Sequence, residues 1–327
     1  MNDTLPLELV RCRAWFETRG ALRIADYPGS AWRGALGHAL KDTACTRPGT
    51  RCAACPERGE CPYPPLFDSA DGGDPFRPYV LEPQAFSGYF PAGSPLALDL
   101  ILFGWLVGWL PLIADALQRL GERGLGMREP VRLTLIDLQQ QTGTDGATWV
   151  SLAAPAAVGL PTAPLAPLGL PPAPPRARMD LITPLKIKYR GALIKPETFG
   201  PRDLLTALAR RIEACAGVLE TLPLTPEPGL WLDSADDLIE RADLHWLDTH
   251  HRSSRQREDL KLGGLVGRLL LRGPVLERCW PWLWLGQWLH LGSSTTIGFG
   301  RYDLEPLSAV GPASSRPAPP RAPKQTV

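Results

Sequence analysis

The order of hydrophobic and polar positions divides the chain into two bodies of similar size. In the first body, apolar and polar residues alternate from Leu7 to Ile24, which predicts a strand or a hairpin. A turn at residues 26–29 follows, and Ser30 is placed to cap a helix from Ala31 to about Thr43. The other elements predicted here are strands at 78–83, 96–103 and 131–139 and a helix at 106–120.

The second body repeats this order. Its predicted elements are a strand at 179–194, a helix at 202–220, strands near 244–247 and 264–271, a tryptophan-rich helix at 279–291 and a last strand at 301–304. Each body therefore follows the order β-α-β-β-α-β of a ferredoxin-like, or RRM-like, domain. We expect an α+β protein with two tandem ferredoxin-like domains and antiparallel sheets.

Proline-rich segments set the expected domain boundaries. Prolines gather at 142–177, which predicts a linker or an embellished loop, and again near the C-terminus, where residues 307–327 are expected to form a disordered tail. The predicted domains are residues 1–141, with a cysteine-rich insertion at 45–75, and residues 178–306.

Composition narrows the classes of function. The 327 residues include 35 Lys and Arg against 34 Asp and Glu, so a nucleic-acid-binding surface must come from local clustering. Eleven tryptophans and 44% hydrophobic residues exclude a wholly disordered chain. The first residues lack the pattern of a signal peptide, and the apolar run at 100–114 is shorter than the about 20 residues of a membrane span. We expect a cytoplasmic protein without a membrane partner.

A glycine-rich stretch follows the tryptophan-rich helix. Gly292, Gly298 and Gly300 flank a run of hydroxyl residues, and such a loop can present backbone N–H groups to phosphates because glycine lets a ligand approach closely. A plain tight turn is the alternative. The candidate binding residues of this stretch are His290, Gly292, Ser293, Ser294, Gly298, Gly300 and Arg301.

The predicted helix at 31–43 places an imidazole and two cations on one face. At about 100° per residue, Arg33, His38 and Lys41 lie opposite the apolar arc. A histidine that titrates near neutrality can take a proton from a 2′-hydroxyl or protonate a leaving oxygen, and a nearby cation can stabilise a phosphorane. The alternative is a surface helix with ordinary solvated charges.

A basic stretch at 250–261 holds four Lys or Arg and two histidines against two acids. This composition suits phosphate and sugar contacts, and with Lys186, Lys188 and Arg190 it would form a basic groove on the second domain. A solvated hairpin loop is the alternative, and His250 and His251 are alternative active-site histidines. The candidate binding residues here are His251, Arg252, Ser254, Arg255, Gln256 and Lys261.

Four of the seven cysteines lie within seventeen residues, at positions 45, 52, 55 and 61. Their clustering and the single C-x-x-C pair predict that Cys45, Cys52, Cys55 and Cys61 bind one structural zinc. An iron–sulfur cluster could use the same ligands, and unliganded thiols are the remaining alternative. The other three cysteines have apolar neighbours in the sequence, which indicates core positions.

Several stretches together resemble the CRISPR-associated endoribonucleases of the RAMP superfamily that process repeat precursor RNA, the Cas-six type. The resemblance covers roughly residues 5–305, and Ser294 stands where members often carry another glycine. The stretches that carry it are Trp32–Leu40, Leu120–Gly126, Leu181–Lys186, Arg252–Gln256 with Lys261–Gly264, and Leu285–Tyr302. It implies that the binding residues named above contact RNA, and it makes Tyr27, His38 and Lys41 the nearest counterparts of the catalytic residues.

The sequence thus predicts a metal-independent endoribonuclease that cleaves CRISPR repeat precursor RNA to mature crRNA. The resemblance implies products with a 2′,3′-cyclic phosphate and a 5′-hydroxyl, retention of the product, and other Cas effector subunits as partners. The alternative is a non-catalytic RAMP subunit that binds crRNA without cutting it. A zinc-dependent enzyme with Cys52, Cys55 and His38 as ligands is a third hypothesis. It is disfavoured because four cysteines would close the coordination shell.

Overall fold

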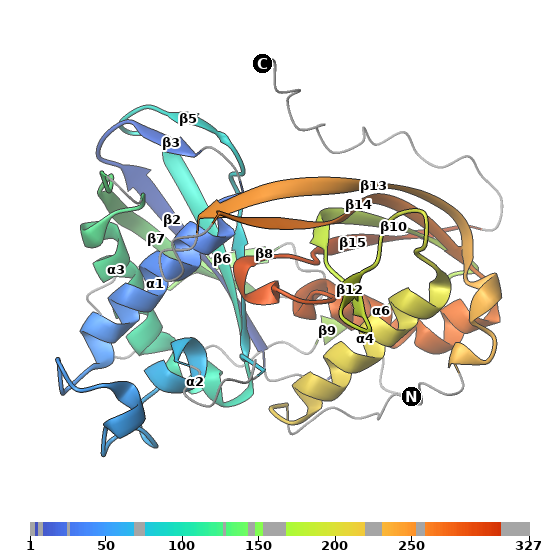
Figure 1. Cartoon of the computed structure of the whole chain (residues 1–327), viewed down its shortest axis with the longest axis horizontal. Coiled ribbons are helices and arrows are strands. Elements are labelled where there is room, and N and C mark those ends of the chain that lie inside the picture. The colour runs from blue at the N-terminus through green and yellow to red at the C-terminus, as the bar shows by residue number, and fades with distance from the viewer. Residues whose placement is uncertain are drawn as a thin grey trace.

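The computed structural model describes residues 4–5, 9–24, 27–68, 76–126, 129–142, 148–152, 168–219, 231–252 and 259–308. For residues 4–5, 168, 249–252 and 259–262 it describes the backbone alone. Within these ranges the chain forms two mixed modules that lie side by side, one from the blue-to-green half of the chain and one from the yellow-to-red half (Figure 1).

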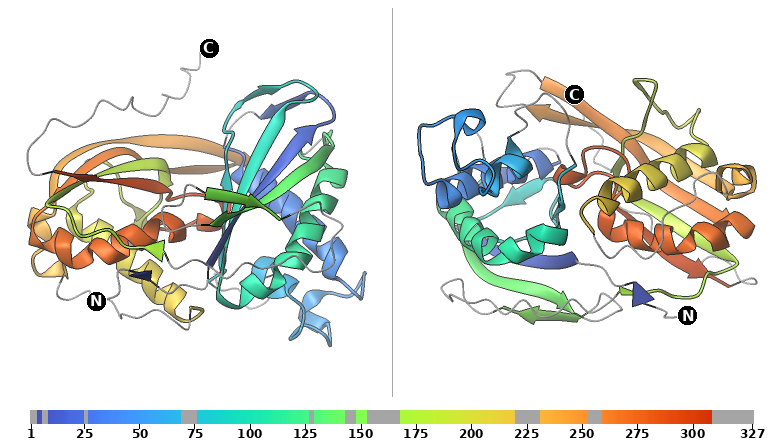
Figure 2. Two further views of the ribbon diagram at one scale, coloured as in Figure 1. Left: turned by 180° about the vertical axis from the view of Figure 1, so that it is seen from behind. Right: turned by 90° about the horizontal axis from the view of Figure 1, so that it is seen from below.

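A five-stranded antiparallel sheet with strand order β4-β6-β2-β7-β8 forms the base of the N-terminal module. The strands are β2 (Leu9–Thr18), β4 (Tyr79–Pro83), β6 (Pro95–Phe103), β7 (Leu133–Thr142) and β8 (Thr148–Ser151). Helices α1 (Gly29–Ala44) and α3 (Leu110–Arg123) cover one face of this sheet (Figures 1 and 2). Strand β2 alternates buried and partly exposed residues because only one of its faces packs against the helices.

Smaller elements decorate this module. Strands β3 (Leu22–Ile24) and β5 (Gly88–Phe90) pair with each other away from the main sheet. The remaining elements are the 3-10 turns η1 (Cys52–Ala54) and η2 (Gly104–Trp109), the short helix α2 (Tyr63–Phe67) and strand β1 (Thr4–Leu5). Strand β1 pairs with β9 (Leu168–Gly169), which precedes the second module.

The C-terminal module has a four-stranded antiparallel sheet with strand order β13-β14-β10-β15. Its strands are β10 (Arg176–Leu185), β13 (Ile239–Arg252), β14 (Asp259–Arg272) and β15 (Tyr302–Leu307), and its helices are α4 (Pro201–Ala216) and α6 (Pro274–Leu289). Short elements complete it: β11 (Lys188–Tyr189), β12 (Ala192–Leu193), η3 (Ala235–Asp237) and η4 (Thr295–Ile297).

Both modules have the ferredoxin-like topology. Numbered within each β-α-β-β-α-β unit, the strands lie in the order 2-3-1-4, with the first and third strands at the centre. The prediction of two tandem ferredoxin-like domains with antiparallel sheets is therefore confirmed.

The element boundaries differ in places from the predicted ones. The strand predicted at 179–194 ends at Leu185, and the rest of it forms the small hairpin β11–β12. Strands β13 and β14 have fourteen residues each, far more than the sequence indicated. The proline-rich segment contains β8, β9 and the start of β10. Residues 153–167 of that segment and 309–327 of the predicted tail lie outside the described residues.

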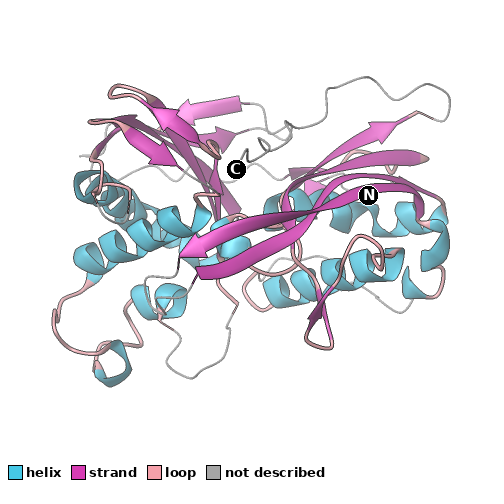
Figure 3. Ribbon diagram, turned by 45° about the horizontal axis from the view of Figure 1, so that its top comes forward, coloured by secondary structure: helices cyan, strands magenta, loops and turns pink. Residues whose placement is uncertain are grey.

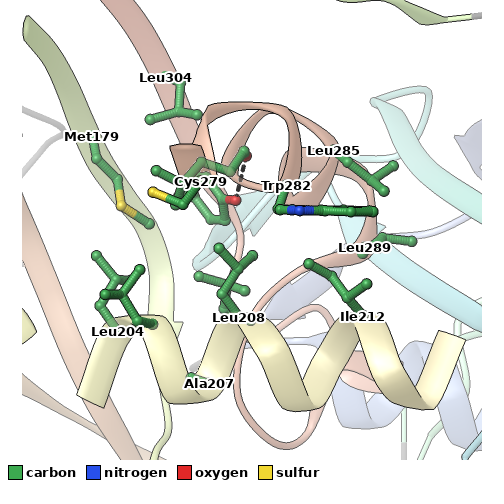
Figure 4. Packing of buried hydrophobic residues seen from close by; sticks show 14 of the residues in the cluster. Met179, Leu204, Ala207, Leu208, Ile212, Cys279, Trp282, Leu285, Leu289 and Leu304 are labelled. Atoms are coloured by element: carbon green, nitrogen blue, oxygen red, sulfur yellow. Dashed lines mark hydrogen bonds between the residues drawn. The ribbon is translucent and has the colours of Figure 1, made fainter. Parts of the chain in front are cut away.

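The C-terminal core is built where α4 packs against α6. Leu208 and Ile212 of α4 point toward Trp282 and Leu289 of α6 (Figure 4). The tryptophan-rich helix is apolar almost all round because it packs against α4 and the sheet, and because the segment at 169–171 accepts hydrogen bonds from Trp280 and Trp284.

The two modules share part of this core. Leu9, Val80, Ile101 and Phe103 of the N-terminal sheet are fully or almost fully buried in the same cluster as α4 and α6. Removal of this apolar surface from water stabilises the contact between the modules. Among the described residues, no helix has the length and apolar character needed to cross a membrane.

Candidate functional site

The glycine-rich loop between α6 and β15 joins the two modules. Its η4 turn packs against β4 and against the N-terminus of α1. Gly298 has φ +89°, and a Cβ there would meet the carbonyl oxygen of Leu81 in β4 and the Tyr27 hydroxyl. A Cβ on Gly29, at the start of α1, would meet the carbonyl oxygen of Ile297. Glycine is required at these two positions because the backbones of the two modules touch there.

Much of the loop's backbone is bonded within the protein. The N–H of Ser293 donates to the Lys186 carbonyl (2.9 Å), that of Gly298 to the Thr295 carbonyl (2.8 Å) and that of Gly300 to the Pro184 carbonyl (3.0 Å). The N–H of Arg301 donates to the Thr183 hydroxyl (2.9 Å). These four N–H groups are not free for phosphates, so the expectation that the loop cradles RNA through them is wrong. Only the edge at 292–294 and 296 is partly exposed.

A buried charge network lies beside the loop. Glu82 of β4 accepts bonds from the Arg11 guanidinium and from Nε2 of His290 (2.8 Å), and Nη1 of Arg301 lies 3.7 Å from it. Burial alone would raise the pKa of Glu82, but Arg11, Arg301 and the His290 hydrogen bond outweigh it and hold that pKa far below the ordinary value. The network joins β2 and β4 of one module to the loop of the other.

His290 is fully buried, with Nδ1 3.0 Å from the Phe299 carbonyl and Nε2 bonded to Glu82. Burial lowers its pKa, and its bonds to Glu82 and Phe299 oppose that shift. The structure therefore corrects its predicted role as an RNA contact, because both ring nitrogens are occupied inside the protein. The Arg301 side chain also lies close to the Glu82 carboxylate, to which it is paired inside the protein.

Two of the predicted binding stretches meet at the β11–β12 hairpin. Ser293 Oγ donates to the Lys186 carbonyl (3.1 Å), which places the exposed edge of the glycine-rich loop beside Lys186. Lys188 and Arg190 are exposed on the same hairpin. Burial, followed by repulsion from Lys188, lowers the pKa of Lys186. Lys186 and Lys188 thus lie close to each other, and a basic groove that includes the stretch 250–261 stays a prediction.

Aromatic side chains accompany this basic surface. Tyr189 is 56% exposed, and the Arg190 guanidinium lies 5.3 Å from its ring centroid. The Lys195 ammonium lies 3.2 Å from the centroid of the Trp246 ring on β13. Proteins that bind single-stranded nucleic acids typically stack the bases on exposed aromatic rings and bind the phosphates with nearby cations. We call Lys186, Lys188, Tyr189 and Arg190 the basic hairpin surface.

The α1 helix separates the predicted catalytic residues. His38 is exposed, whereas the Lys41 ammonium lies 5.5 Å from the Tyr63 ring centroid and lines the cavity of the cysteine segment. The Arg33 Nε donates to the Tyr79 hydroxyl (3.1 Å), and its guanidinium lies 5.2 Å from the Phe67 ring centroid. Of these polar groups, His38 is the one that faces solvent freely.

Tyr27 lies at the other end of the same helix. Its ring packs edge-on against Phe299 at 5.2 Å, and its hydroxyl is buried without a hydrogen-bond partner among the described residues. Burial, together with the negative charge of Glu82, raises the pKa of this hydroxyl well above its ordinary value. His38 follows nine residues after Gly29, about 13 Å along the axis at 1.5 Å per residue. The structure therefore does not bring Tyr27 to His38.

The β13–β14 hairpin extends from the C-terminal module toward the helices of the N-terminal module, as Figures 1 and 3 show. Its far end carries the predicted residues His251, Arg252 and Lys261, whose backbone alone is described. Ser254, Arg255 and Gln256 lie outside the described residues. The backbone thus directs the basic stretch toward the module that carries His38.

The cysteine segment follows α1 directly. Cys45, Cys52, Cys55 and Cys61 are partly exposed, form no disulfide and all line one cavity of about 340 Å³. Among the described residues, no three His, Cys, Asp or Glu side chains are close enough to hold a single metal ion. The predicted zinc site is thus not found as a formed coordination shell, and metal binding there stays a prediction.

Several functional features escaped the sequence. Glu82 and Arg11 gave no signal because each occupies an ordinary position on a strand. The exposed Tyr189 next to Arg190 is a visible aromatic–basic pair, and the alternation of Lys188, Tyr189 and Arg190 could have indicated a stacking surface.

Comparisons with known proteins follow this division into modules. Residues 179–302 match the family model of the CRISPR-associated endoribonuclease Cas6, and residues 6–155 match that of the AF_1859_N N-terminal domain. A protein of Archaeoglobus fulgidus described as uncharacterized is 29% identical over 129 residues. That alignment covers 38% of this chain and 44% of the relative, so less than half of the relative is matched.

Solved structures share the whole fold. A Thermus thermophilus Cas6 matches with a TM-score of 0.51 and 13% identity over 91% of this chain and 99% of its own. A Cas6 product complex matches with a TM-score of 0.54 and 17% identity over 91% and 100%. A partial Cas6-RT-Cas1–Cas2 complex matches with a TM-score of 0.54 and 15% identity over 92% and 47%.

The chain thus consists of two ferredoxin-like modules joined by a glycine-rich loop before the last strand. The second module therefore matches the family model of the CRISPR-associated endoribonuclease Cas6 over residues 179–302, and the chain has the fold of solved Cas6 structures.

Proposed function

We propose that this protein cleaves CRISPR repeat precursor RNA to mature crRNA without a catalytic metal. The observation that carries the proposal is the Cas6 match over residues 179–302, on a module whose basic hairpin surface meets the edge of the glycine-rich loop. Exposed cations and an exposed tyrosine give that surface the means to bind single-stranded RNA.

The proposed reaction is an intramolecular transesterification. The 2′-oxygen of one nucleotide attacks the adjacent phosphorus while the bond to the 5′-oxygen of the next nucleotide breaks. The attacking hydroxyl gives up one proton and the leaving oxygen takes one up, so the products are a 2′,3′-cyclic phosphate and a 5′-hydroxyl. His38 is the candidate for one of these transfers because it is an exposed imidazole.

Support for the RNA path comes from the course of the backbone. The β13–β14 hairpin leads from the basic hairpin surface toward the N-terminal module (Figure 3). An RNA strand that follows this hairpin would run from Lys188 and Tyr189 toward α1. Tyr27 and Lys41 do not share the exposed position of His38, so the proposal assigns neither a proton transfer.

The test is single-turnover cleavage of a repeat RNA in the presence of a strong chelator, with mapping of the product ends. We expect cleavage at one position, with a cyclic phosphate on the upstream fragment. A substrate with a single 2′-deoxy nucleotide at that position should be bound but not cleaved. Cleavage of that deoxy substrate would contradict a 2′-oxygen nucleophile.

The second candidate function is a non-catalytic subunit that holds crRNA. It is favoured by the distance of Tyr27 from His38 and by the position of Lys41 against the Tyr63 ring, because no hydrogen bond to His38 is found among the described side chains. Tight binding of repeat RNA with no cleavage under any metal condition would establish it, and cleavage only with added metal would favour a zinc-dependent enzyme. Co-purification with crRNA and effector subunits would show retention in either case.

A further inference from the structure

The cysteine segment is a loop with little apolar core of its own. From Cys45 to Cys61 the backbone folds through successive short turns, in which the N–H of Thr50 bonds to Arg47, that of Cys55 to Cys52 and that of Cys61 to Glu57. The η1 turn in the middle has no buried residue. A segment of this kind gains its order from a cross-link or a bound metal centre rather than from packing.

The four thiols nevertheless converge. Cys45 caps the C-terminus of α1, Cys52 and Cys55 begin and end the η1 turn, and Cys61 lies just before α2. All four line the same cavity, and Cys52 and Cys61 also pack against the N-terminal core. The end of α1, the η1 turn and the residue before the cap of α2 thus bring their cysteines to one cavity.

Four cysteines can hold one of two metal centres, which differ in how closely the sulfur atoms must approach one another. A zinc ion bound at about 2.3 Å by four sulfurs requires sulfur atoms about 3.8 Å apart. Among the described residues no three His, Cys, Asp or Glu side chains form a group that could hold one metal ion, although all four cysteines line one cavity of about 340 Å³. An iron–sulfur cube is held by four thiolates that stand farther apart, since each binds a different iron.

We propose that Cys45, Cys52, Cys55 and Cys61 bind a [4Fe–4S] cluster, which anchors the segment between α1 and α2. When a preformed cluster binds, four S–H bonds break, four Fe–S bonds form, the protons leave to solvent and the oxidation state of iron is unchanged. Lys41, Arg47 and Arg58 line the cavity together with Glu57 and Glu60, so the lining has a net positive charge that offsets part of the negative charge of a cluster with four thiolate ligands.

The cluster would support the face of α1 that carries His38. Helix α2 places Phe67 against Gly37, where an added Cβ would lie 2.8 Å from the Phe67 ring, and Phe67 also packs on Tyr79 with 5.7 Å between ring centroids. Loss of the cluster would release α2 from one side and loosen this packing. The inference is independent of the proposed RNA cleavage, because its readout is the metal content.

The test uses the full chain purified without oxygen. We expect about four irons and four acid-labile sulfides per chain and the broad visible absorption of Fe–S bonds. A synthetic [4Fe–4S] cluster with small thiolate ligands, added to metal-free protein, should transfer by ligand exchange. One equivalent of zinc in place of iron, or metal-free protein that takes up no cluster, would overturn the proposal.

Variants supply the control. Cys52→Ser with Cys61→Ser should remove the iron and sulfide, whereas Cys12→Ala, which alters a buried cysteine remote from the cavity, should retain both. Retention of iron and sulfide by the double variant would overturn the assignment of these ligands. If the double variant does not fold, the iron and sulfide content of the unsubstituted chain still decides the matter.

Discussion

At the scale of single residues, two histidines show how burial decides chemistry. His38 is exposed on α1 and can exchange protons with a substrate, whereas His290 is fully buried and bonded on both sides. The sequence placed His38 in the site because it lies on the polar face of a predicted helix, and His290 because it lies beside the glycine-rich stretch. Burial of one particular side chain depends on how the modules meet, and no local pattern contains that information.

Replacement of His38 by alanine tests the catalytic assignment. We expect a loss of about 10²–10⁴-fold in the single-turnover cleavage rate, the usual contribution of general acid–base catalysis, with the affinity for repeat RNA unchanged. Asp115→Ala, at an exposed carboxylate of α3 away from the proposed RNA path, is the control and should cleave at the original rate. Equal rates for His38→Ala and the control would exclude His38.

The depressed pKa of Glu82 predicts a loss of stability in acid. Because this pKa is lower in the folded protein than the ordinary 4.5, the ion network contributes stability above about pH 4.5 that is lost as the pH falls below that value. Thermal unfolding followed from pH 7 to pH 3 should show this decline.

Glu82→Gln should lower the free energy of unfolding at pH 7 by about 3–5 kcal/mol, the usual cost of breaking a buried ion pair, and flatten the decline in acid. Asp303→Asn, at an exposed carboxylate of β15, is the control and should change neither. An unchanged acid profile in Glu82→Gln would mean that other carboxylates cause the decline.

At the scale of elements, hydrophobic periodicity located both helices of each module and the buried strands. Hydrophobic periodicity did not give the lengths of strands whose residues lie outside the core. Most of the β13 positions described in full are exposed or partly exposed, so β13 has no alternating pattern to mark its fourteen residues. The β11–β12 hairpin was likewise merged with β10, because a bend in the chain is not visible in apolar spacing.

The β11–β12 hairpin offers a test of the basic hairpin surface. Tyr189→Ala should weaken the binding of single-stranded repeat RNA by about 1–3 kcal/mol, the value of one stacked base, while Tyr189→Phe should bind as the original protein does. Filter binding at fixed salt measures the effect. If Tyr189→Phe weakens RNA binding as much as Tyr189→Ala does, the hydroxyl group rather than the ring contacts the RNA.

At the scale of the whole molecule, the glycine-rich loop is a joint between modules. Gly298→Ala should destabilise the protein by about 1–3 kcal/mol, the cost of a strained backbone position, because φ is +89° and Leu81 lies against the added carbon. Gly34→Ala is the control, since it lies in α1 with open space around it and should stabilise by about 0.5–1 kcal/mol. Chemical denaturation measures the free energy of unfolding of both variants. If Gly298→Ala is as stable as Gly34→Ala, the close contact between the modules at Gly298 is not needed for stability.

The shared core makes the covalent link between the modules dispensable in principle. Leu9, Val80, Ile101 and Phe103 pack with the helices of the other module, and the Glu82 network crosses the same boundary. Two separately encoded halves, divided between β8 and β9, should therefore find each other in the cell and copurify as a heterodimer. In such a split protein, assembly of the RNA surface would become dependent on concentration.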